Sequence, residues 1–269
     1  MKVDPHSIWS DIQKIKSNSP LVHNITNYVV MEQTANSLLA LGASPVMAHA
    51  LEEVEDMTMI ASSLVLNIGT LSSPWVSSML LAIKTANRKG IPVVFDPVGA
   101  GATQYRTKTA NTIIAHGIIT AIRGNASEIV SLCNVQGMTK GVDTSLNPME
   151  HVQQAKLLAS RKRCIVWMSG KSDIITDGES CIFVHNGHPL MEKVTGMGCG
   201  ATAIAGAFLA INPNAFLGLV HAAILISISG EIAARRSNGP GSFIPLFMDT
   251  LYSISLAEIE EYICVEYYE

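Results

Sequence analysis

The stretch Val194-Thr195-Gly196-Met197-Gly198-Cys199-Gly200-Ala201-Thr202-Ala203 joins a glycine-rich turn to a long apolar segment. Three glycines within five residues allow the backbone to approach a ligand without Cβ clashes. Residues 201–211 are apolar enough to predict a buried helix. A glycine-rich turn that opens a helix presents unpaired N–H groups and the positive end of the helix dipole, which suits a phosphate. The stretch therefore predicts an anion site at Gly198 and Gly200.

Cys199 stands between these two glycines. The field of a helix N-terminus lowers the pKa of a thiol, so we expect Cys199 to be a thiolate or a proton acceptor. The local sequence leaves a second interpretation open, namely a glycine turn with a buried cysteine, because isolated glycine-rich motifs are weak signals.

The length fits one large α/β domain or two small ones. The chain has 269 residues, of which 48% are hydrophobic, 15% charged and 6% aromatic. Neither a linker nor an internal repeat stands out, so we expect a single domain over residues 1–269. The net charge is −4, and no Lys/Arg cluster with interleaved aromatic residues is present, which argues against nucleic acid as a partner.

The five cysteines are an odd number, widely spread, with no metal-binding spacing, so we expect a reducing cytoplasmic environment. Residues 1–20 are too mixed and polar for a signal peptide. The apolar segment 201–230 is interrupted by Asn212-Pro213-Asn214, which leaves halves shorter than the roughly 20 residues needed to span a bilayer. We therefore expect two packed core helices and no membrane segment.

Short apolar runs alternate with amphipathic stretches, which predicts a mainly parallel sheet with helices on both faces. Strands are expected at residues 20–23, 45–47, 63–68, 91–95, 118–122 and 164–168, and helices at 27–41, 52–56, 72–90, 147–160 and from 126 onward. Asn27 is the expected N-cap of the first of these helices, and Gly42 its end. Asp177-Gly178 between residues 174–176 and 181–184 predicts a β-hairpin.

In such a sheet, ligands bind outside the carboxyl ends of the strands. Polar residues follow the predicted strands at these ends: His23-Asn24, Met47-Ala48-His49, Asn67-Ile68-Gly69-Thr70, Asp96-Pro97-Val98-Gly99, Arg123-Gly124-Asn125 and Ser169-Gly170-Lys171. This recurrence is more informative than any one of the motifs.

Asp96 and Glu128 are candidate ligands of Mg²⁺, held directly or through water. Asp96 follows a buried-looking strand and precedes a glycine-rich loop. Asn125-Ala126-Ser127-Glu128 also reads as a capping box in its Asn form, and both roles are compatible. For Asp96 the alternative is a cap of the next turn.

Arg123 comes at the end of an apolar strand, where a charge needs a partner. A phosphate would provide one, and a salt bridge to a local acid is the alternative. The hydroxyl and backbone of Ser169-Gly170-Lys171 could contact a nucleotide or form a plain surface turn. Met47 could line a pocket for a small aromatic ring or fill a gap in the core.

Together these residues resemble the hydroxyethylthiazole kinase family, within the ribokinase-like superfamily, from about residue 20 to residue 251. The motifs that carry the resemblance are Val22-His23-Asn24-Ile25-Thr26-Asn27, Gly42-Ala43-Ser44-Pro45-Val46-Met47, Leu66-Asn67-Ile68-Gly69-Thr70-Leu71, Asp96-Pro97-Val98-Gly99-Ala100, Arg123-Gly124-Asn125-Ala126-Ser127-Glu128, Val194-Thr195-Gly196-Met197-Gly198-Cys199 and Gly239-Pro240-Gly241-Ser242-Phe243. Met197 and Ser169 depart from the pattern, which has Thr at both places.

The resemblance implies a ribokinase-like three-layer α/β sandwich that phosphorylates 4-methyl-5-(2-hydroxyethyl)thiazole with ATP and Mg²⁺. It also implies a homotrimer with active sites at subunit interfaces. By the resemblance, Cys199 occupies the place of the catalytic Asp of sugar-kinase relatives. The remaining site residues that it implies are, for the substrate, Met47, Gly196, Asn24 and Asn27; for ATP, Arg123, Ser169 and Asn125; and for the metal, Asp96 and Glu128.

Three alternatives stay open at this stage. A related vitamin kinase would act on hydroxymethylpyrimidine or pyridoxal instead. A dehydratase of hydrated nicotinamide nucleotides would consume ATP without phosphorylating an alcohol. A nucleotide- or thiazole-binding protein would have lost catalysis, and the intact set of Asp96, Arg123, Glu128 and Cys199 argues against that loss.

Overall fold

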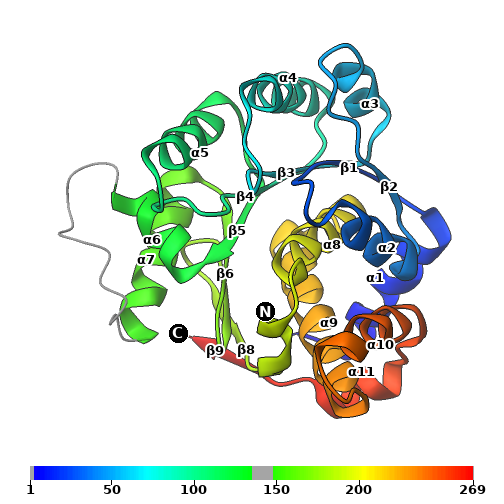
Figure 1. Ribbon diagram of the computed structural model, residues 1–269. Coiled ribbons are helices and arrows are strands. Elements are labelled where there is room, and N and C mark those ends of the chain that lie inside the picture. Colours follow the sequence, from blue (N-terminus) through cyan, green and yellow to red (C-terminus); the bar gives the residue numbers. More distant parts are fainter. Residues whose placement is uncertain (1–2, 135–147, 269) are drawn as a thin grey trace.

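The computed structural model describes residues 3–134 and 148–268. Its helices and strands alternate through most of the chain (Figure 1). The elements in chain order are α1 (Pro5–Asn18), β1 (Leu21–Ile25), α2 (Met31–Leu41), β2 (Ser44–Val46), α3 (Val54–Ile60), β3 (Ser63–Asn67), α4 (Ser73–Lys89), β4 (Val93–Asp96), α5 (Gln104–His116), β5 (Ala121–Asn125), α6 (Ala126–Asn134), α7 (Pro148–Lys162), β6 (Ile165–Ser169), β7 (Asp173–Thr176), β8 (Cys181–Val184), η1 (Pro189–Lys193), α8 (Met197–Ile211), α9 (Ala215–Arg236), α10 (Pro240–Ser253), α11 (Leu256–Tyr262) and β9 (Val265–Tyr268).

The described strands form one nine-stranded sheet in the order β2-β1-β3-β4-β5-β6-β7-β8-β9. Strands β1 to β6 are all parallel, whereas β7, β8 and β9 join antiparallel. The predicted α/β class, with a mainly parallel sheet, is therefore confirmed. The predicted hairpin around Asp177-Gly178 is also confirmed, and it connects β7 to β8.

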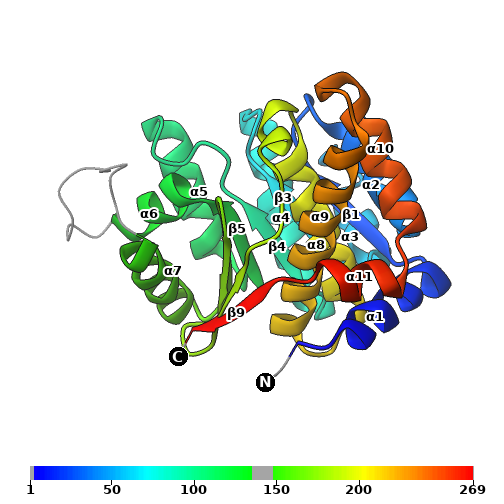
Figure 2. The same cartoon turned by 90° about the horizontal axis from the view of Figure 1, so that it is seen from below.

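Helices cover both faces of the sheet (Figures 1 and 2). Helices α3 to α7 lie on one face, and α1, α2 and α8 to α11 lie on the other. Within β3, Leu64 and Leu66 pack on the first side and Val65 on the second, because successive side chains of a strand point to opposite faces. Burial on both faces explains why these strands read as continuous apolar runs.

The predicted bounds of the fifth strand are wrong by about three residues. Residues 118–122 were expected, but β5 runs from Ala121 to Asn125. Ile118 is 73% exposed, and its backbone bonds to the side chain of Asn87 at the end of α4 instead of to a neighbouring strand. Arg123 consequently lies inside β5.

The prediction of Asn27 as a helix N-cap is wrong, because α2 begins at Met31 after Val30. The Asn27 side chain is engaged in other hydrogen bonds, which the next subsection describes. The end of α2 is as predicted: Gly42 takes a left-handed conformation with φ 101°, and its N–H bonds to the carbonyl of Leu38.

The two predicted core helices are confirmed as α8 and α9, but α8 begins at Met197, four residues before the predicted start. Gly198 to Gly200 therefore belong to its first turn. The expectation that neither helix is long enough to span a bilayer is wrong for α9. Among the described residues, this 22-residue helix alone has the length and apolarity of a span, and 83% of its most apolar window is buried inside the protein.

Candidate functional site

A chain of buried polar side chains lies at the carboxyl ends of β3 and β4, on the face covered by α8. Asn67 and Asp96 are register partners on these neighbouring strands. Asn67 Nδ2 donates to Asp96 Oδ2 at 3.0 Å, and Thr202 Oγ1 of α8 donates to the same oxygen at 2.7 Å. Asp96 is therefore fixed both to the sheet and to the first turns of α8.

Burial raises the pKa of Asp96 to about 6. The negative charge of Glu128 contributes to this rise, whereas the Arg123 charge and the hydrogen bonds from Thr202 and Asn67 act in the opposite direction. Two carboxylates and one guanidinium thus interact at this edge of the sheet.

Glu128 closes a capping box at the start of α6, as the alternative reading of its motif predicted. Asn125 N–H donates to Glu128 Oε2 at 2.8 Å, and Glu128 N–H donates to Asn125 Oδ1 at 2.9 Å. Its other oxygen, Oε1, accepts from the N–H of Gly99 at 2.8 Å. Glu128 therefore also holds the loop that follows Asp96.

Cys199 is the third residue of α8, and its Sγ accepts a hydrogen bond from Asn27 Nδ2 at 3.3 Å. The same amide donates to Asn67 Oδ1 at 2.9 Å. Burial raises the pKa of the Cys199 thiol to about 11, and the negative charge of Asp96 adds to this effect. Burial and the Asp96 charge therefore favour the neutral thiol over the expected thiolate.

Arg123 reaches from β5 to the first turn of α8. Its Nη1 lies against Gly198 so closely that a methyl group at Gly198 would overlap it. The guanidinium lies over the ring of Trp167, with Cζ 5.6 Å from the ring centre. Within residues 3–134 and 148–268, Arg123 Nε is buried without a hydrogen-bond partner, which points to an anionic ligand at this place.

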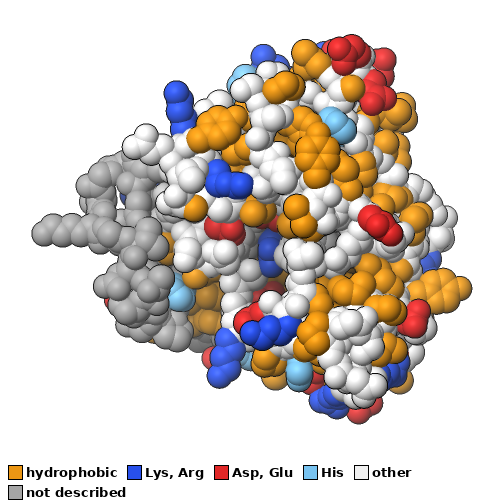
Figure 3. Space-filling model, viewed as in Figure 1, with side chains coloured by type: hydrophobic (Ala, Val, Ile, Leu, Met, Phe, Trp, Pro, Cys, Tyr) orange, Lys and Arg blue, Asp and Glu red, His pale blue; other side chains and the backbone are white. Residues whose placement is uncertain are grey.

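A cavity of about 640 Å³ opens beside Arg123. Figure 3 shows a hollow bordered by acidic and basic side chains near the middle of this view. The cavity is lined by residues from the ends of β5 and β6, from η1 and from α8, including five of the predicted site residues: Arg123, Asn125, Ser169, Gly196 and Gly198. Asn125 and Ser169 are register partners, and the Ser169 hydroxyl donates weakly to the Gly124 carbonyl at 3.4 Å.

Seven of the predicted site residues do not line this cavity: Met47, Asn24, Asn27, Asp96, Glu128, Cys199 and Gly200. Met47 follows β2 beside a group of three rings, those of Tyr28, His49 and Trp75, whose centres lie 4.5 to 6.2 Å apart. Asn24 is fully buried in β1, where its Nδ2 donates to the Val22 carbonyl. The structure therefore brings Asn27 to Cys199 but leaves Met47 and Asn24 apart from the cavity.

Arg106 is a contributor that the sequence reasoning missed. From α5 it donates to the carbonyls of Ile68, Gly69 and Val98, each at 2.7 Å. It thereby ties together the loops that follow β3 and β4. The sequence signal was weak, because an arginine near a helix start usually lies in solvent.

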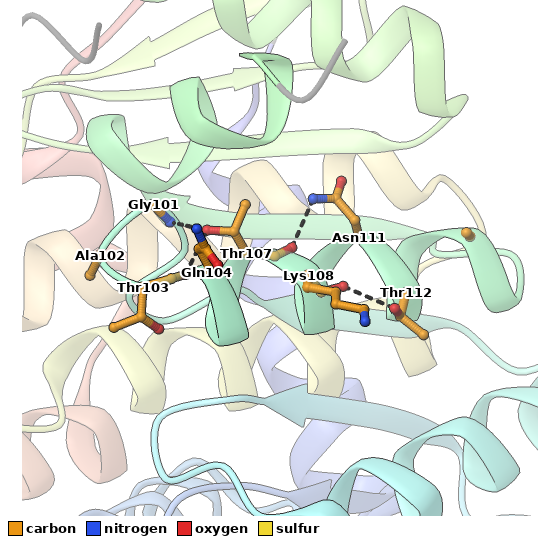
Figure 4. A pocket seen from close by; sticks show the side chains of 9 residues that line it. Gly101, Ala102, Thr103, Gln104, Thr107, Lys108, Asn111 and Thr112 are labelled. Atoms are coloured by element: carbon orange, nitrogen blue, oxygen red, sulfur yellow. Dashed lines mark hydrogen bonds between the residues drawn. The ribbon is translucent and has the colours of Figure 1, made fainter.

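A second concavity, of about 750 Å³, lies along α5 (Figure 4). Its polar groups are largely satisfied locally: Thr107 Oγ1 accepts from Gly101 N–H, Asn111 donates to the Thr107 carbonyl, and Thr112 donates to the Lys108 carbonyl. Lys108 is the one charged residue in its lining. This surface therefore lacks the convergent charges of the cavity at Arg123.

No group of three or more His, Cys, Asp or Glu side chains in the described part of the chain could enclose a metal ion. The negative charge of Glu128 disfavours ionisation of Asp96. A cation beside the two carboxylates would relieve this repulsion. This donor set suits a hydrated Mg²⁺ that arrives with phosphates better than a protein cage.

The model of the hydroxyethylthiazole kinase family matches residues 12–257. A hydroxyethylthiazole kinase of Desulfotalea psychrophila is 51% identical over 251 residues, which make up 93% of this chain and 92% of that protein. One of Syntrophus aciditrophicus is 48% identical over 260 residues, 96% of each chain.

Solved structures agree with these matches. The hydroxyethylthiazole kinase protein of Pyrococcus horikoshii OT3 has a TM-score of 0.91 and 40% identity, covering 98% of this chain and 100% of that one. The pyridoxal kinase of Staphylococcus aureus in complex with pyridoxal has a TM-score of 0.65 at 16% identity, covering 92% and 97%. This second likeness shows the fold alone.

Proposed function

Because this chain belongs to the hydroxyethylthiazole kinase family, we propose that it transfers the γ-phosphoryl group of ATP to the hydroxyl of 4-methyl-5-(2-hydroxyethyl)thiazole in thiamine salvage. The observation that carries the proposal within the molecule is the contact of Arg123 with Gly198, one residue before Cys199. The Arg123 guanidinium, the N-terminus of α8 and the Cys199 side chain meet there, as phosphoryl transfer to an alcohol requires.

The phosphates of ATP lie in the cavity beside Arg123, with the transferring group at the first turn of α8. The N–H groups of Gly198 and Cys199 lie in the first turn of α8, where backbone N–H groups lack intrahelical carbonyl partners, and they face the phosphate in this proposal. The Gly200 N–H is not available in the same way, because it donates to the Gly196 carbonyl at 2.8 Å. The buried Nε of Arg123 supports the same assignment. Asn125 and Ser169 lie at the ends of β5 and β6 and border the nucleotide.

Asp96 and Glu128 hold the waters of a hydrated Mg²⁺ in this proposal. When bound, the ion neutralises charge on the phosphate oxygens, which carries much of the catalysis in phosphoryl transfer. Asn67 and Thr202 fix the Asp96 carboxylate, and the capping box fixes Glu128. The chain therefore presents two oriented carboxylates without binding the metal in a cage.

Cys199 contacts the acceptor hydroxyl as a neutral thiol. Its raised pKa disfavours a standing thiolate at neutral pH. Because the transition state of phosphoryl transfer is usually loose, the hydroxyl proton leaves late and a strong base is not essential. Asn27 orients the thiol. Gly196, the N-cap residue of α8, lines the cavity and borders the acceptor there in this proposal.

The thiazole site is completed at an interface of a homotrimer, to which Met47 belongs on the substrate side, whereas Asn24 is fully buried within β1. Large apolar side chains are exposed in the segments that follow β1 and β2: Tyr28 is 63% exposed, Val29 66% and Leu51 51%. Burial of such side chains favours association. Sedimentation should give three times the chain mass of 28.8 kDa, and a monomer would overturn this part of the proposal.

The unbroken nine-stranded sheet supports one domain over residues 1–269. All five cysteines are unpaired, which supports a reducing compartment such as the cytoplasm.

The test is identification of the product. Purified protein, ATP, Mg²⁺ and the thiazole are incubated, and the thiazole phosphate is sought by mass spectrometry. Formation of the phosphate in proportion to enzyme supports the proposal. ADP without thiazole phosphate would instead indicate hydrolysis or another acceptor, and would overturn it.

A further inference from the structure

The Trp167 ring supports the Arg123 guanidinium. The two residues are register partners on β5 and β6, so their side chains point to the same face of the sheet. Arg123 Cζ lies 5.6 Å from the ring centre, within the range of a cation–π interaction. Since Arg123 Nε is buried without a hydrogen-bond partner among the described residues, the ring is a principal support of this side chain.

Asp173 in turn fixes the Trp167 indole. Trp167 Nε1 donates to Asp173 Oδ2 at 2.8 Å. An indole in a sheet can tilt or flip about its χ angles, and a hydrogen bond to its one donor selects a single orientation. The plane on which Arg123 rests is therefore set by a carboxylate six residues further along the chain.

Asp173 is itself held by the turn that joins β6 to β7. Its Oδ1 accepts from the N–H of Gly170 at 3.0 Å, next to Ser169. Burial raises the pKa of Asp173, whereas the Gly170 N–H, the Arg123 charge and the Trp167 N–H favour its ionised form. Both carboxylate oxygens thus accept hydrogen bonds from fixed donors.

We propose that Asp173 is a positioning residue for nucleotide binding: by holding the Trp167 indole, it fixes the Arg123 guanidinium at the phosphate end of the cavity. This inference rests on the proposed function, because it takes the cavity to hold the phosphates of ATP. It assigns Asp173 an action through Trp167, although Asp173 also lines the cavity.

Asp173→Asn is the sharpest variant. The amide has nearly the same volume, but its Nδ2 would face one of two donors, either the Trp167 indole or the Gly170 N–H. Asp177→Asn is the matched control. Asp177 also accepts two backbone N–H groups, those of Glu179 and Ser180, but at the far end of the same hairpin.

Trp167→Phe tests whether Asp173 acts through the indole. It keeps an aromatic ring under Arg123 and removes the N–H donor. If the action passes through Trp167, then Asp173→Asn should have little further effect in a Trp167→Phe background. If Asp173 contacts the nucleotide itself, the two effects should add.

The measurement is calorimetric binding of a non-hydrolysable ATP analogue with Mg²⁺, without thiazole. We expect Asp173→Asn and Trp167→Phe each to weaken binding by about tenfold, since small displacements of a positioned group are costly. The double variant should match the singles, and Asp177→Asn should match the wild type. Wild-type affinity in Asp173→Asn, or additive losses in the double variant, would overturn the inference.

If Asp173→Asn does not fold, Trp167→Phe decides by itself, and an unchanged affinity there overturns the inference. The assay separates the inference from the proposed function. A wild-type protein that binds the analogue but makes no thiazole phosphate overturns the function and leaves the role of Asp173 to be judged on binding.

Discussion

The side-chain amide of Asn27 donates a hydrogen bond to the Sγ of Cys199 over 3.3 Å, although the two residues are 172 positions apart in the chain. The other amide hydrogen goes to Asn67, which donates to Asp96. Cys199 and Asp96 thus belong to one chain of hydrogen bonds that runs through Asn27 and Asn67. Such a network fixes the positions of all its members.

Removal of the Asn27 amide should free the Cys199 side chain. We expect Asn27→Ala to lower kcat by about tenfold, because a reacting group loses its orientation. Steady-state kinetics with saturating ATP and thiazole measure the effect. Asn111→Ala is the control, since among the described residues that amide bonds to the Thr107 carbonyl of its own helix and to no residue of the site. An unchanged kcat in Asn27→Ala would show that the hydrogen bond is dispensable.

Substitution of Cys199 tests its contact with the acceptor. We expect Cys199→Ser to keep part of the turnover, and Cys199→Asp to equal or exceed the wild type, because an ionised carboxylate can accept a proton, whereas the raised pKa of Cys199 keeps its thiol neutral. General-base assistance contributes typically about 10²- to 10⁴-fold. Equal rates for Cys199→Ala and the wild type would exclude a catalytic role.

Loss of the Arg123 charge should impair the use of ATP more than that of the thiazole. We expect Arg123→Ala to lower kcat/KM for ATP by about 100-fold, the scale of losing one preorganised charge partner of a transition state. The KM for thiazole should change little. Arg88→Ala is a suitable control, because Arg88 pairs with Glu55 on the surface. Unchanged KM and kcat for ATP would refute the assignment.

A side chain at Gly198 should displace Arg123, since a methyl group there would overlap Nη1. We expect Gly198→Ala to lower kcat/KM for ATP by about tenfold or more, while the helix remains folded. Gly241→Ala at the start of α10 is the matched control, because nothing lies within 4 Å of its added methyl. Equal kcat/KM values for ATP in the two variants would show that the close approach of Arg123 to Gly198 does not contribute to activity.

Acid should weaken the link between α1 and α9. Burial raises the pKa of Asp11, but hydrogen bonds from His221 and Asn212 and the His221 charge outweigh it and lower the pKa below its usual 3.8. Since the folded-state pKa is depressed, Asp11 stabilises the fold fully above about pH 4, and this contribution is lost as the pH falls through the folded-state value.

Asp11→Asn isolates this contribution. Breaking a buried pair costs about 3 kcal/mol, so at pH 7 the variant should unfold at lower urea concentration than the wild type. The difference should shrink as the pH falls below 4, because the wild type loses its own charge there. Asp56→Asn at the surface is the control. A difference that stays constant down to pH 3 would contradict the role of ionised Asp11.

Local patterns predicted much of the fold. The alternation of apolar runs and helical stretches, the hairpin at Asp177-Gly178 and the capping box of Asn125 with Glu128 all depend on residues close in sequence. The side of the sheet on which the site lies also followed, because parallel strands end at one edge. The helix start at Met197 was placed too late, since glycines count against a helix in isolation.

The contacts within the site were not predictable in the same way. The hydrogen bond of Asn27 to Cys199 and that of Thr202 to Asp96 depend on tertiary packing, whereas the local sequence predicts a helix cap at Asn27. The pKa of the Cys199 thiol depends on burial and on Asp96, which the local sequence around Cys199 does not reveal. Arg106 had no motif to mark it.

The most direct measurement is ADP release by the purified protein with Mg-ATP, run in parallel with 4-methyl-5-(2-hydroxyethyl)thiazole, hydroxymethylpyrimidine and pyridoxal. Turnover that depends on the thiazole, with kcat/KM far above that for the other two alcohols, is the expected result. If the thiazole supported no ADP release and another alcohol did, the fold assignment would stand and the proposed substrate would be contradicted.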